Sequence, residues 1–321
     1  MRRGFTLMEA LVVVAVAGIV LGYFSAAAAP RSRELSNRAV CAANLRGLAQ
    51  SMAVYGASEN DAFPCLPPPA SATQYDASLK PDLADTADAG DAIHTLYTSN
   101  KRASSPTEPL WILVLNGEVS TKQFICKSDS FGGTPAAVMG ADSKTTNLNF
   151  QDEKNISYSV AYPWTVDQKE KVVVSAIWRD QTDASLPLLS DMAPYVGSKA
   201  GPGEVATRPP GSDPKTPVDP DWAVTKANSQ NHQFEGQNVA FGDSHVEFTR
   251  NPAVGQNMDS IWGIEKQPKG AWNANGAWQP QGGNHAEVPI EAGALPHAPM
   301  GGPGQEDVVM VPARDSGGHL K

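Results

Sequence analysis

Apolar side chains dominate the first 24 residues. From Phe5 to Phe24 the apolar run contains one charged residue, Glu9. Twenty residues of α-helix are about 30 Å long, which is the thickness of the hydrocarbon core of a bilayer. The pattern therefore predicts a membrane-spanning helix over residues 5–24. Glu9 should need a partner there, because a charge inside a membrane costs about 2.5 to 3.5 kcal/mol.

An amphipathic helical pattern follows the apolar run. Pro30 predicts a kink rather than an end, because apolar residues resume beyond it at spacings of three and four. Leu45, Leu48 and Met52 form the centre of this stripe. Such a stripe is typical of a helix face that packs on a globular domain. We therefore predict one stem helix over residues 5–60, whose second half carries a head.

Residues 61–264 have the pattern of an α+β head. Short alternating or apolar runs predict strands at residues 119–126, 156–162, 172–178, 186–190, 238–241 and 246–248. The last two runs flank turn residues and predict a β-hairpin. A short helix is expected at residues 107–116, where Thr107 can cap the first turn and Pro109 suits it.

Three stretches of the head predict surface loops. They are rich in Pro, Gly, Asp or small polar residues and cover residues 65–106, 130–155 and 197–220. The segment from residue 265 to residue 321 is rich in Gly and Pro and has no sustained periodicity, which predicts a largely disordered or loosely attached tail. Within it, residues 308–311 could add one strand.

Charge and cysteine content narrow the function classes. The chain carries 25 basic and 34 acidic residues, for a formal net charge of −9. This balance argues against nucleic acid as a partner, because phosphate-backbone binding relies on a basic surface. Three cysteines allow at most one intramolecular disulfide and leave one thiol.

The amino terminus resembles a known processing signal. Arg2-Arg3-Gly4, then Phe5-Thr6-Leu7-Met8-Glu9 and the apolar run, is similar to the class III signal of type IV prepilins and type II secretion pseudopilins. The resemblance implies a leader of residues 1–4, cleavage after Gly4 by prepilin peptidase and N-methylation of Phe5. Glu9 would become the fifth mature residue. It could neutralise the terminal ammonium of a neighbouring subunit and so act in assembly.

Two other interpretations of this terminus stay open. One is a plain membrane anchor in which the glutamate has no function. The other is a secretory signal peptide cleaved near Ala26 to Ala29, since basic residues, an apolar core and small residues also describe such a signal. The length of the apolar run and the helical pattern beyond Pro30 favour the prepilin interpretation.

Later segments resemble the prepilin-like proteins marked by a His-x9-Asp-Gly motif, which are abundant in planctomycetes and related to the major pseudopilins. The resemblance covers residues 41–64, 110–129 and 228–262. This chain departs from the motif twice, because ten residues separate His232 from Asp243 and Ser244 replaces the glycine. Family-typical cysteine positions imply a Cys41–Cys126 disulfide, and a Cys65–Cys126 bridge is the alternative.

His232, Asp243 and His245 form the one candidate site in the sequence. They could be metal ligands or acid–base groups, but we favour His232 and Asp243 as groups that hydrogen-bond to the backbone around the hairpin and lock it. Asp191 and Asp243 are calcium candidates by family position. The sequence contains no nucleotide loop, catalytic triad or paired-carboxylate arrangement, so we expect neither an enzyme nor a cofactor.

The resemblance implies a type IV pilin-like α+β fold, in which a long amino-terminal helix packs on a small antiparallel sheet. It also implies a structural subunit of a type II secretion pseudopilus or a type IV pilus-like filament. Such a protein would cross the inner membrane once, with its head in the periplasm or another extracytoplasmic space. Its partners would be prepilin peptidase, other copies and other pseudopilins through the stem. The alternatives are an anchored envelope-binding protein that forms no filament and a metal-dependent enzyme.

Overall fold

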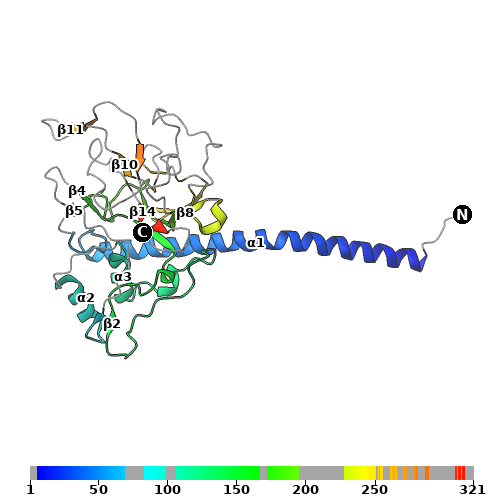
Figure 1. The fold of residues 1–321 in the computed structure, drawn as a ribbon, viewed down its shortest axis with the longest axis horizontal. Helices are drawn as coiled ribbons and strands as arrows, with labels where there is room; N and C mark the ends of the chain where they lie inside the picture. Colours follow the sequence, from blue (N-terminus) through cyan, green and yellow to red (C-terminus); the bar gives the residue numbers. More distant parts are fainter. Residues whose placement is uncertain are drawn as a thin grey trace.

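A computed structural model describes residues 6–68, 83–98, 106–166, 172–194 and 228–250, together with short segments between residues 252 and 314. Its main feature is one long helix, α1, whose carboxy-terminal half packs against an α+β head (Figure 1). The amino-terminal half extends away from the head. An α+β architecture with an amino-terminal helix and small antiparallel sheets was predicted, and it is confirmed.

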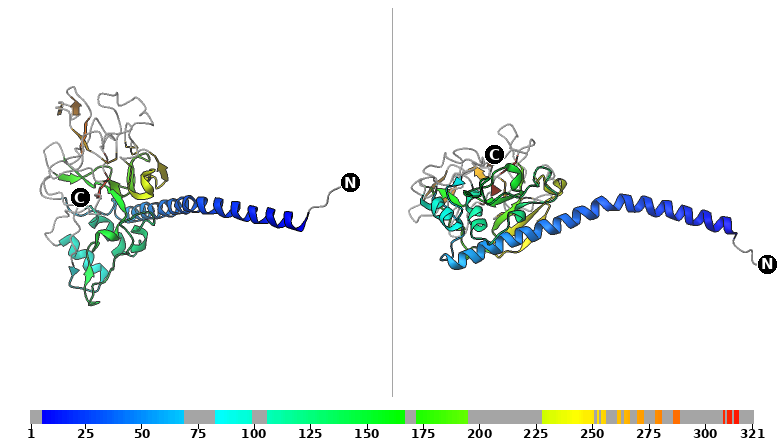
Figure 2. Two further views of the ribbon diagram at one scale, coloured as in Figure 1. Left: turned by 45° about the vertical axis from the view of Figure 1, so that its right-hand side comes forward. Right: turned by 90° about the horizontal axis from the view of Figure 1, so that it is seen from below.

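Helix α1 runs without interruption from Leu7 to Ser58 and contains Pro30. Its first turn is closed by a capping box, in which Thr6 and Glu9 each accept from the backbone of the other. The helix bends part-way along its length (Figure 2), as expected of a helix with an internal proline. Within the described part of the chain, no helix is both long and apolar enough to cross a membrane. The span over residues 5–24 stays a prediction.

The second half of α1 buries one face in the head. Cys41, Leu45, Leu48 and Met52 have no exposed surface, and they recur at spacings of three and four. This confirms the predicted stripe. The helix contacts the central strands of the head sheet as well as its edge.

The head sheet has five strands in the order β14-β3-β6-β8-β9, and every neighbouring pair is antiparallel. The strands are β3 (Tyr158–Ala161), β6 (Pro187–Asp191), β8 (Gln237–Phe241), β9 (Val246–Thr249) and β14 (Met310–Val311). The strands predicted at residues 156–162, 186–190, 238–241 and 246–248 are therefore present. The predicted hairpin is the β8–β9 pair.

The alternation of residues 156–162 suggests a strand with one buried face, but all four residues of β3 are buried. The alternating small polar residue Ser159 faces the interior as well. Its hydroxyl accepts a hydrogen bond from the backbone N–H of Ala193 at 2.8 Å, which satisfies its polarity without water.

Smaller elements surround the sheet. The helices are α2 (Ala89–Thr98), α3 (Glu108–Leu115) and the 3-10 turns η2 (Thr121–Phe124), η3 (Glu153–Asn155) and η4 (Asn231–Phe234). The paired short strands are β1 (Leu83–Ala84) with β2 (Thr146–Asn147), and β4 (Trp164–Val166) with β5 (Val172–Val174). Three further pairs are β7 (Ala193–Pro194) with β15 (Ala313–Arg314), β10 (Ile264–Lys266) with β13 (Ala286–Val288), and β11 (Gly270–Trp272) with β12 (Trp278–Pro280).

The strand predicted at residues 119–126 was wrong. The segment forms the 3-10 turn η2 because Ser120 caps it and Gln123 bonds back to the cap backbone. The strand predicted at residues 172–178 ends at Val174, and a turn follows. Helix α3 was expected, but the Thr107 side chain does not cap it, since its hydroxyl donates to Asn149 Oδ1 at 3.0 Å.

The predicted loop at residues 65–106 contains helix α2. Asp88 accepts from the backbone N–H of Asp91 at its start, and the helix buries Ala92 and Leu96. The loop predicted at residues 130–155 contains only β2 and η3, whereas the loop predicted at 197–220 lies outside the described residues.

Part of the predicted tail joins the head. Met310 and Val311 form β14, which pairs with β3 at the edge of the main sheet. The strand expected at residues 308–311 is therefore confirmed. Ala313 and Arg314 continue into β15 and pair in parallel with β7.

Candidate functional site

The first turn of α1 holds the carboxylate that the sequence singled out. Glu9 Oε2 accepts hydrogen bonds from the Thr6 backbone N–H and from the Thr6 hydroxyl, both at 2.8 Å. The Glu9 backbone N–H donates in turn to Thr6 Oγ1 at 3.3 Å. Glu9 therefore has a role within its own chain as a helix cap. The predicted processing residues Gly4 and Phe5 lie outside the described residues.

Between Leu7 and Leu21, helix α1 presents apolar side chains on all sides. The large hydrophobic residues exposed there are Leu7, Met8, Leu11, Val12, Val13, Val14, Val16, Ile19, Val20 and Leu21. Leu7 is 84 % exposed and Ile19 is 73 % exposed. A helix that is apolar all round normally lies inside a larger protein assembly or a membrane. This segment is therefore an interaction surface that a protein assembly or a membrane should cover.

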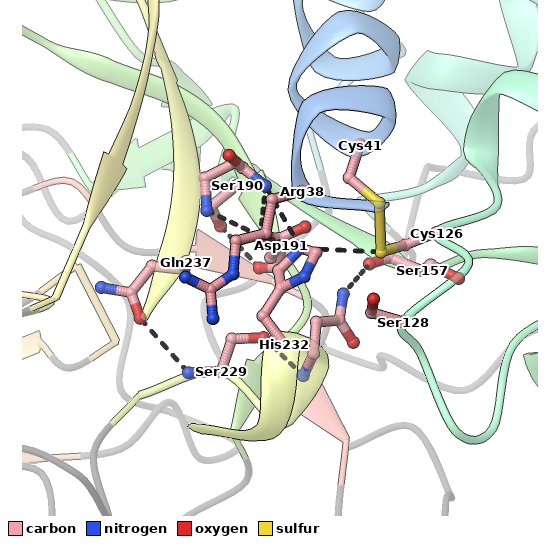
Figure 3. Close-up of polar contacts among 12 residues, drawn as sticks. Arg38, Cys41, Cys126, Ser128, Ser157, Ser190, Asp191, Ser229, His232 and Gln237 are labelled. Carbon is pink, nitrogen blue, oxygen red and sulfur yellow. Dashed lines mark hydrogen bonds and ion pairs between the residues drawn. A yellow bond between two sulfur atoms is a disulfide. The ribbon is translucent and has the colours of Figure 1, made fainter. Parts of the chain in front are cut away.

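A second cluster lies where α1 joins the head, and we call it the His232 cluster. It consists of Glu34, Cys41, Cys126, Asp191 and His232 (Figure 3 shows all but Glu34). His232 is fully buried in η4.

The backbone around His232 is unusual. His232, Gln233 and Phe234 all have positive φ, at 57°, 60° and 62°. This left-handed region is costly for residues other than glycine and is maintained only where the surroundings fix it. Here Asn231 Nδ2 donates to the Ser157 carbonyl at 3.0 Å. Asn228 Nδ2 similarly donates to the carbonyl of Phe234 at 3.0 Å. These bonds hold the loop on the sheet.

Both ring nitrogens of His232 face carboxylates. Nδ1 lies 2.6 Å from Glu34 Oε1, and Nε2 lies 3.2 Å from Asp191 Oδ2. Nε2 is also 3.7 Å from Cys126 Sγ and 3.2 Å from Asn238 Nδ2. Asn238 fixes Asp191, because its backbone N–H and its amide both donate to Oδ2, at 2.6 and 3.0 Å.

These carboxylates favour the imidazolium form. Burial by itself would lower the pKa of His232, but hydrogen bonds and charge interactions with Asp191 and Glu34 outweigh it and raise the pKa above its ordinary value. In the protonated ring, Nδ1–H donates to Glu34 and Nε2–H donates to Asp191. The cluster is then a buried carboxylate–imidazolium–carboxylate chain between α1, η4 and β6.

Three residues of one α1 face fasten the stem to the head. Glu34, Arg38 and Cys41 are spaced by four and three residues and therefore share a side of the helix. Arg38 Nε lies 3.5 Å from Glu34 Oε1, and its guanidinium pairs with Glu235 and lies 4.4 Å from the centre of the Phe248 ring. The pairing with Arg38 lowers the pKa of Glu235.

Cys41 and Cys126 form a disulfide, with their Cα atoms 5.4 Å apart. Of the two pairings that the sequence left open, the structure contains the one that the family resemblance implied. Cys65 is the free cysteine. Burial raises the pKa of its thiol to about 12, against smaller opposing effects from Trp164 and Leu66. A thiol with so little thiolate at neutral pH is a poor nucleophile.

The structure does not bring the predicted trio of His232, Asp243 and His245 together. Asp243 and His245 are exposed in the β8–β9 turn, where Asp243 Oδ1 accepts from the His245 backbone N–H at 3.0 Å and contacts its Nδ1. Asp243 thus bonds to backbone as expected. The His232 ring was expected to do the same, but it bonds to side chains instead. Ser244 adopts a φ of 66°, which explains why glycine suits this position.

Asp191 and Asp243 also do not form a calcium pair. Asp191 is buried and contacts Asn238 near the start of β8, whereas Asp243 follows the end of β8. The two carboxylates therefore lie toward opposite ends of one strand, too far apart to bind the same ion.

Sequence reasoning missed Glu34, Arg38 and Asn238 as partners of the cluster. The spacing of Glu34, Arg38 and Cys41 along one helix face is visible in the sequence. Their head partners are not, because His232 lies 198 residues from Glu34 along the chain.

Comparison with known proteins settles the character of the amino terminus. Residues 1–24 match the family model of the prokaryotic N-terminal methylation motif. The amino terminus of the chain is prepilin-like. No curated protein and no solved structure matches the chain significantly. The finer resemblance to the His-x9-Asp-Gly proteins stays a prediction.

The prepilin-like motif overlaps the start of helix α1. The motif ends at residue 24, inside helix α1, and the apolar surface described above lies within it. The motif implies processing by a prepilin peptidase, and pilin-like subunits are the class of protein with which such a stem can assemble. The His232 cluster lies beyond the motif and belongs to the junction of stem and head.

Proposed function

We propose that this chain is a structural subunit of a type II secretion pseudopilus or a type IV pilus-like filament. Prepilin peptidase cleaves it after Gly4, and Phe5 is then N-methylated. The mature chain is held in the inner membrane by its single apolar helix, with the head in the periplasm or another extracytoplasmic space. It acts without a catalytic site or a cofactor, and it assembles with further copies or other pseudopilins.

One observation carries this proposal. The methylation motif continues directly into a helix whose amino-terminal half leaves the head (Figure 1), and the residues from Leu7 to Leu21 expose apolar side chains all round. Parallel packing of such helices buries this surface in a filament, and the membrane covers it before assembly. About 25 cal/mol is gained for each Å² of apolar surface removed from water, so the exposed segment strongly favours a covered state.

Intact mass measurement of the protein extracted from membranes tests the processing step. We expect a species that begins at Phe5 and carries one additional methyl group. A species that begins near Ala29 or Pro30 would identify a secretory signal peptide and overturn the proposal. An unprocessed chain beginning at Met1 would identify a plain anchor.

Cross-linking of stems tests assembly. Two cysteines on each stem, at exposed Val12 and Ile19 in a Cys65→Ser background, should join each chain to two neighbours and yield a ladder of oligomers on oxidation in membranes. A matched pair of cysteines at exposed Gln50 and Ala57, seven residues apart on the stem–head segment, reports random collisions. A ladder no stronger than that control would contradict filament formation.

The second candidate is an anchored envelope-binding protein that uses the prepilin-like signal only for targeting. The acidic balance of the chain and the long insertions between its strands favour this candidate. It shares the processed amino terminus with the first proposal. The two differ in the cross-linking experiment, where a monomeric anchored protein gives no ladder.

A further inference from the structure

We infer that Cys41, Cys126, His232 and Asp191 are the ligands of a zinc site that forms when the Cys41–Cys126 disulfide is reduced. Each of these buried residues offers one ligand atom, and the four atoms lie within 4.8 Å of one another. Two thiolates, an imidazole and a carboxylate are ligand types that Zn²⁺ binds with tetrahedral geometry. While the disulfide is intact, both sulfurs are bonded to each other and the site is closed.

The histidine is oriented as a metal ligand requires. His232 Nε2 points to Cys126 Sγ and Asp191 Oδ2, at 3.7 and 3.2 Å, and its other nitrogen is held by Glu34 at 2.6 Å. Metal-binding histidines usually donate their second N–H to a carboxylate, which fixes the ring and raises its basicity. Glu34 therefore occupies the position of a supporting residue behind the ligand.

The carboxylate also has a free ligand atom. Asp191 Oδ2 is held by Asn238, but the buried Oδ1 has no hydrogen-bond partner within the described structure. A buried carboxylate oxygen without a partner is costly and calls for an explanation. Coordination of a cation by the Asp191 carboxylate would remove that cost.

Four separate elements place the ligands around one point. Cys41 comes from α1, Cys126 follows η2, Asp191 ends β6 and His232 belongs to η4 (Figure 3). With Zn–S bonds of about 2.3 Å, the two sulfurs of a tetrahedral site stand about 3.8 Å apart. Breaking the disulfide lets the sulfurs separate to such a distance by side-chain rotation, while the other two ligands are already fixed.

The conversion of the disulfide into a zinc site is a balanced reaction when a dithiol is the reductant. The dithiol supplies two electrons and two protons, the Cys41–Cys126 bond breaks to give two thiols, and the reductant becomes a disulfide. Zn²⁺ then displaces both thiol protons and the proton on His232 Nε2, which pass to solvent. The stem–head junction is thus cross-linked by the disulfide under oxidising conditions and by the zinc ion under reducing conditions.

Cobalt binding to the full chain tests this inference. The Cys65→Ser variant in mild detergent leaves Cys41 and Cys126 as the cysteines, and a phosphine reductant opens their disulfide and is removed before the metal is added. Co²⁺ should then give the thiolate charge-transfer band and the visible bands of a tetrahedral site at one ion per chain. Added Zn²⁺ should abolish these bands, and the oxidised protein should show none.

Substitutions distinguish metal binding by all four ligands from metal binding by the two thiols alone. His232→Gln and Asp191→Asn should each weaken Co²⁺ binding, and Glu34→Gln should weaken it by about 10- to 100-fold as expected for a supporting residue. His245→Gln in the exposed turn is the matched control and should change nothing. A folded, reduced protein without the charge-transfer band overturns the inference, as does a band that His232→Gln leaves unaltered. If the reduced chain loses its fold, stoichiometric Zn²⁺ should restore the circular dichroism spectrum, and failure to restore it overturns the inference equally.

Discussion

Glu9 has a capping role in the structure and an assembly role implied by the prepilin resemblance, and a single substitution to alanine cannot separate the two. Its carboxylate closes the capping box with Thr6, and the proposed function also gives it a charge interaction with the amino terminus of a neighbouring subunit. Capping boxes accept Gln as well as Glu at this position, because the backbone N–H needs an acceptor rather than a charge.

We therefore predict that Glu9→Gln keeps the helix start but abolishes the stem cross-linking ladder. Thr6→Val is the complementary variant, since it removes the cap hydroxyl and keeps the charge. It should cost about 1 kcal/mol of helix stability and leave the ladder in place. A normal ladder from Glu9→Gln would show that the carboxylate acts only as a cap.

His232 should make the stability of the disulfide-bonded head depend on pH. Burial lowers the pKa of His232 in the folded state, but hydrogen bonds and charge interactions with Asp191 and Glu34 outweigh burial and raise it. The imidazolium therefore stabilises the fold fully below the unfolded-state pKa of about 6.5, and this contribution is lost as the pH rises through the folded-state pKa. The charged groups facing it are Glu34 and Asp191, with Arg38 behind Glu34.

Urea unfolding of the oxidised protein in a chelator, at a series of pH values, measures this effect. His232→Gln should remove that part of the pH dependence and destabilise the fold by about 3 to 5 kcal/mol, because it leaves the buried Asp191 charge uncompensated. His245→Gln, an exposed histidine, serves as the control. A pH profile that is the same in His232→Gln and the parent would show that His232 is not charged in the fold.

Among the elements, those with a strong periodic pattern were predictable from the sequence. Helix α1 and the β8–β9 hairpin combine such a pattern with a cap or turn residues that agree with it. Segment 119–126 misled because Val119 and the apolar run Phe124–Cys126 suggest a strand, while the Ser120–Gln123 capping box favours a helical turn. Helix α2 was hidden in an acidic stretch because it buries only Ala92 and Leu96.

The candidate site was less predictable than the elements. His232 could be identified as a notable residue, but its environment depends on tertiary packing between segments 198 residues apart. Alternation and spacing carry no information about such contacts. They place Asp243 and His245 near His232 in sequence, although Glu34 and Asp191 are its partners in space.

The buried face of α1 should dominate the attachment of the stem. Leu48 has no exposed surface and lies at the centre of the stripe. Leu48→Ala should lower the free energy of unfolding of the head by about 2 to 5 kcal/mol, through lost burial and the cavity left behind. Val54→Ala, on the exposed side of the same helix, should change it by about 0.5 kcal/mol or less. Equal effects in urea unfolding would contradict the packing seen here.

At the scale of the whole molecule, α1 divides into two parts with separate tasks. Residues from Glu34 onward are tied to the head by an ion-pair chain, a disulfide and an apolar stripe. The described side chains from Leu7 to Leu21 take no part in these ties and carry the apolar surface. Assembly and head stability should therefore respond to different substitutions.

The Cys41→Ser, Cys126→Ser double variant tests this division. The disulfide joins residues 85 positions apart, and its loss should reduce the free energy of unfolding by about 2 to 5 kcal/mol, since it constrains the unfolded chain. Measured with a chelator present, this loss reports the disulfide alone. The stem cross-linking ladder should persist, because the surface that forms it begins at Leu7 and lies before the junction. A double variant whose head stays folded but whose ladder disappears would show that the junction itself takes part in assembly.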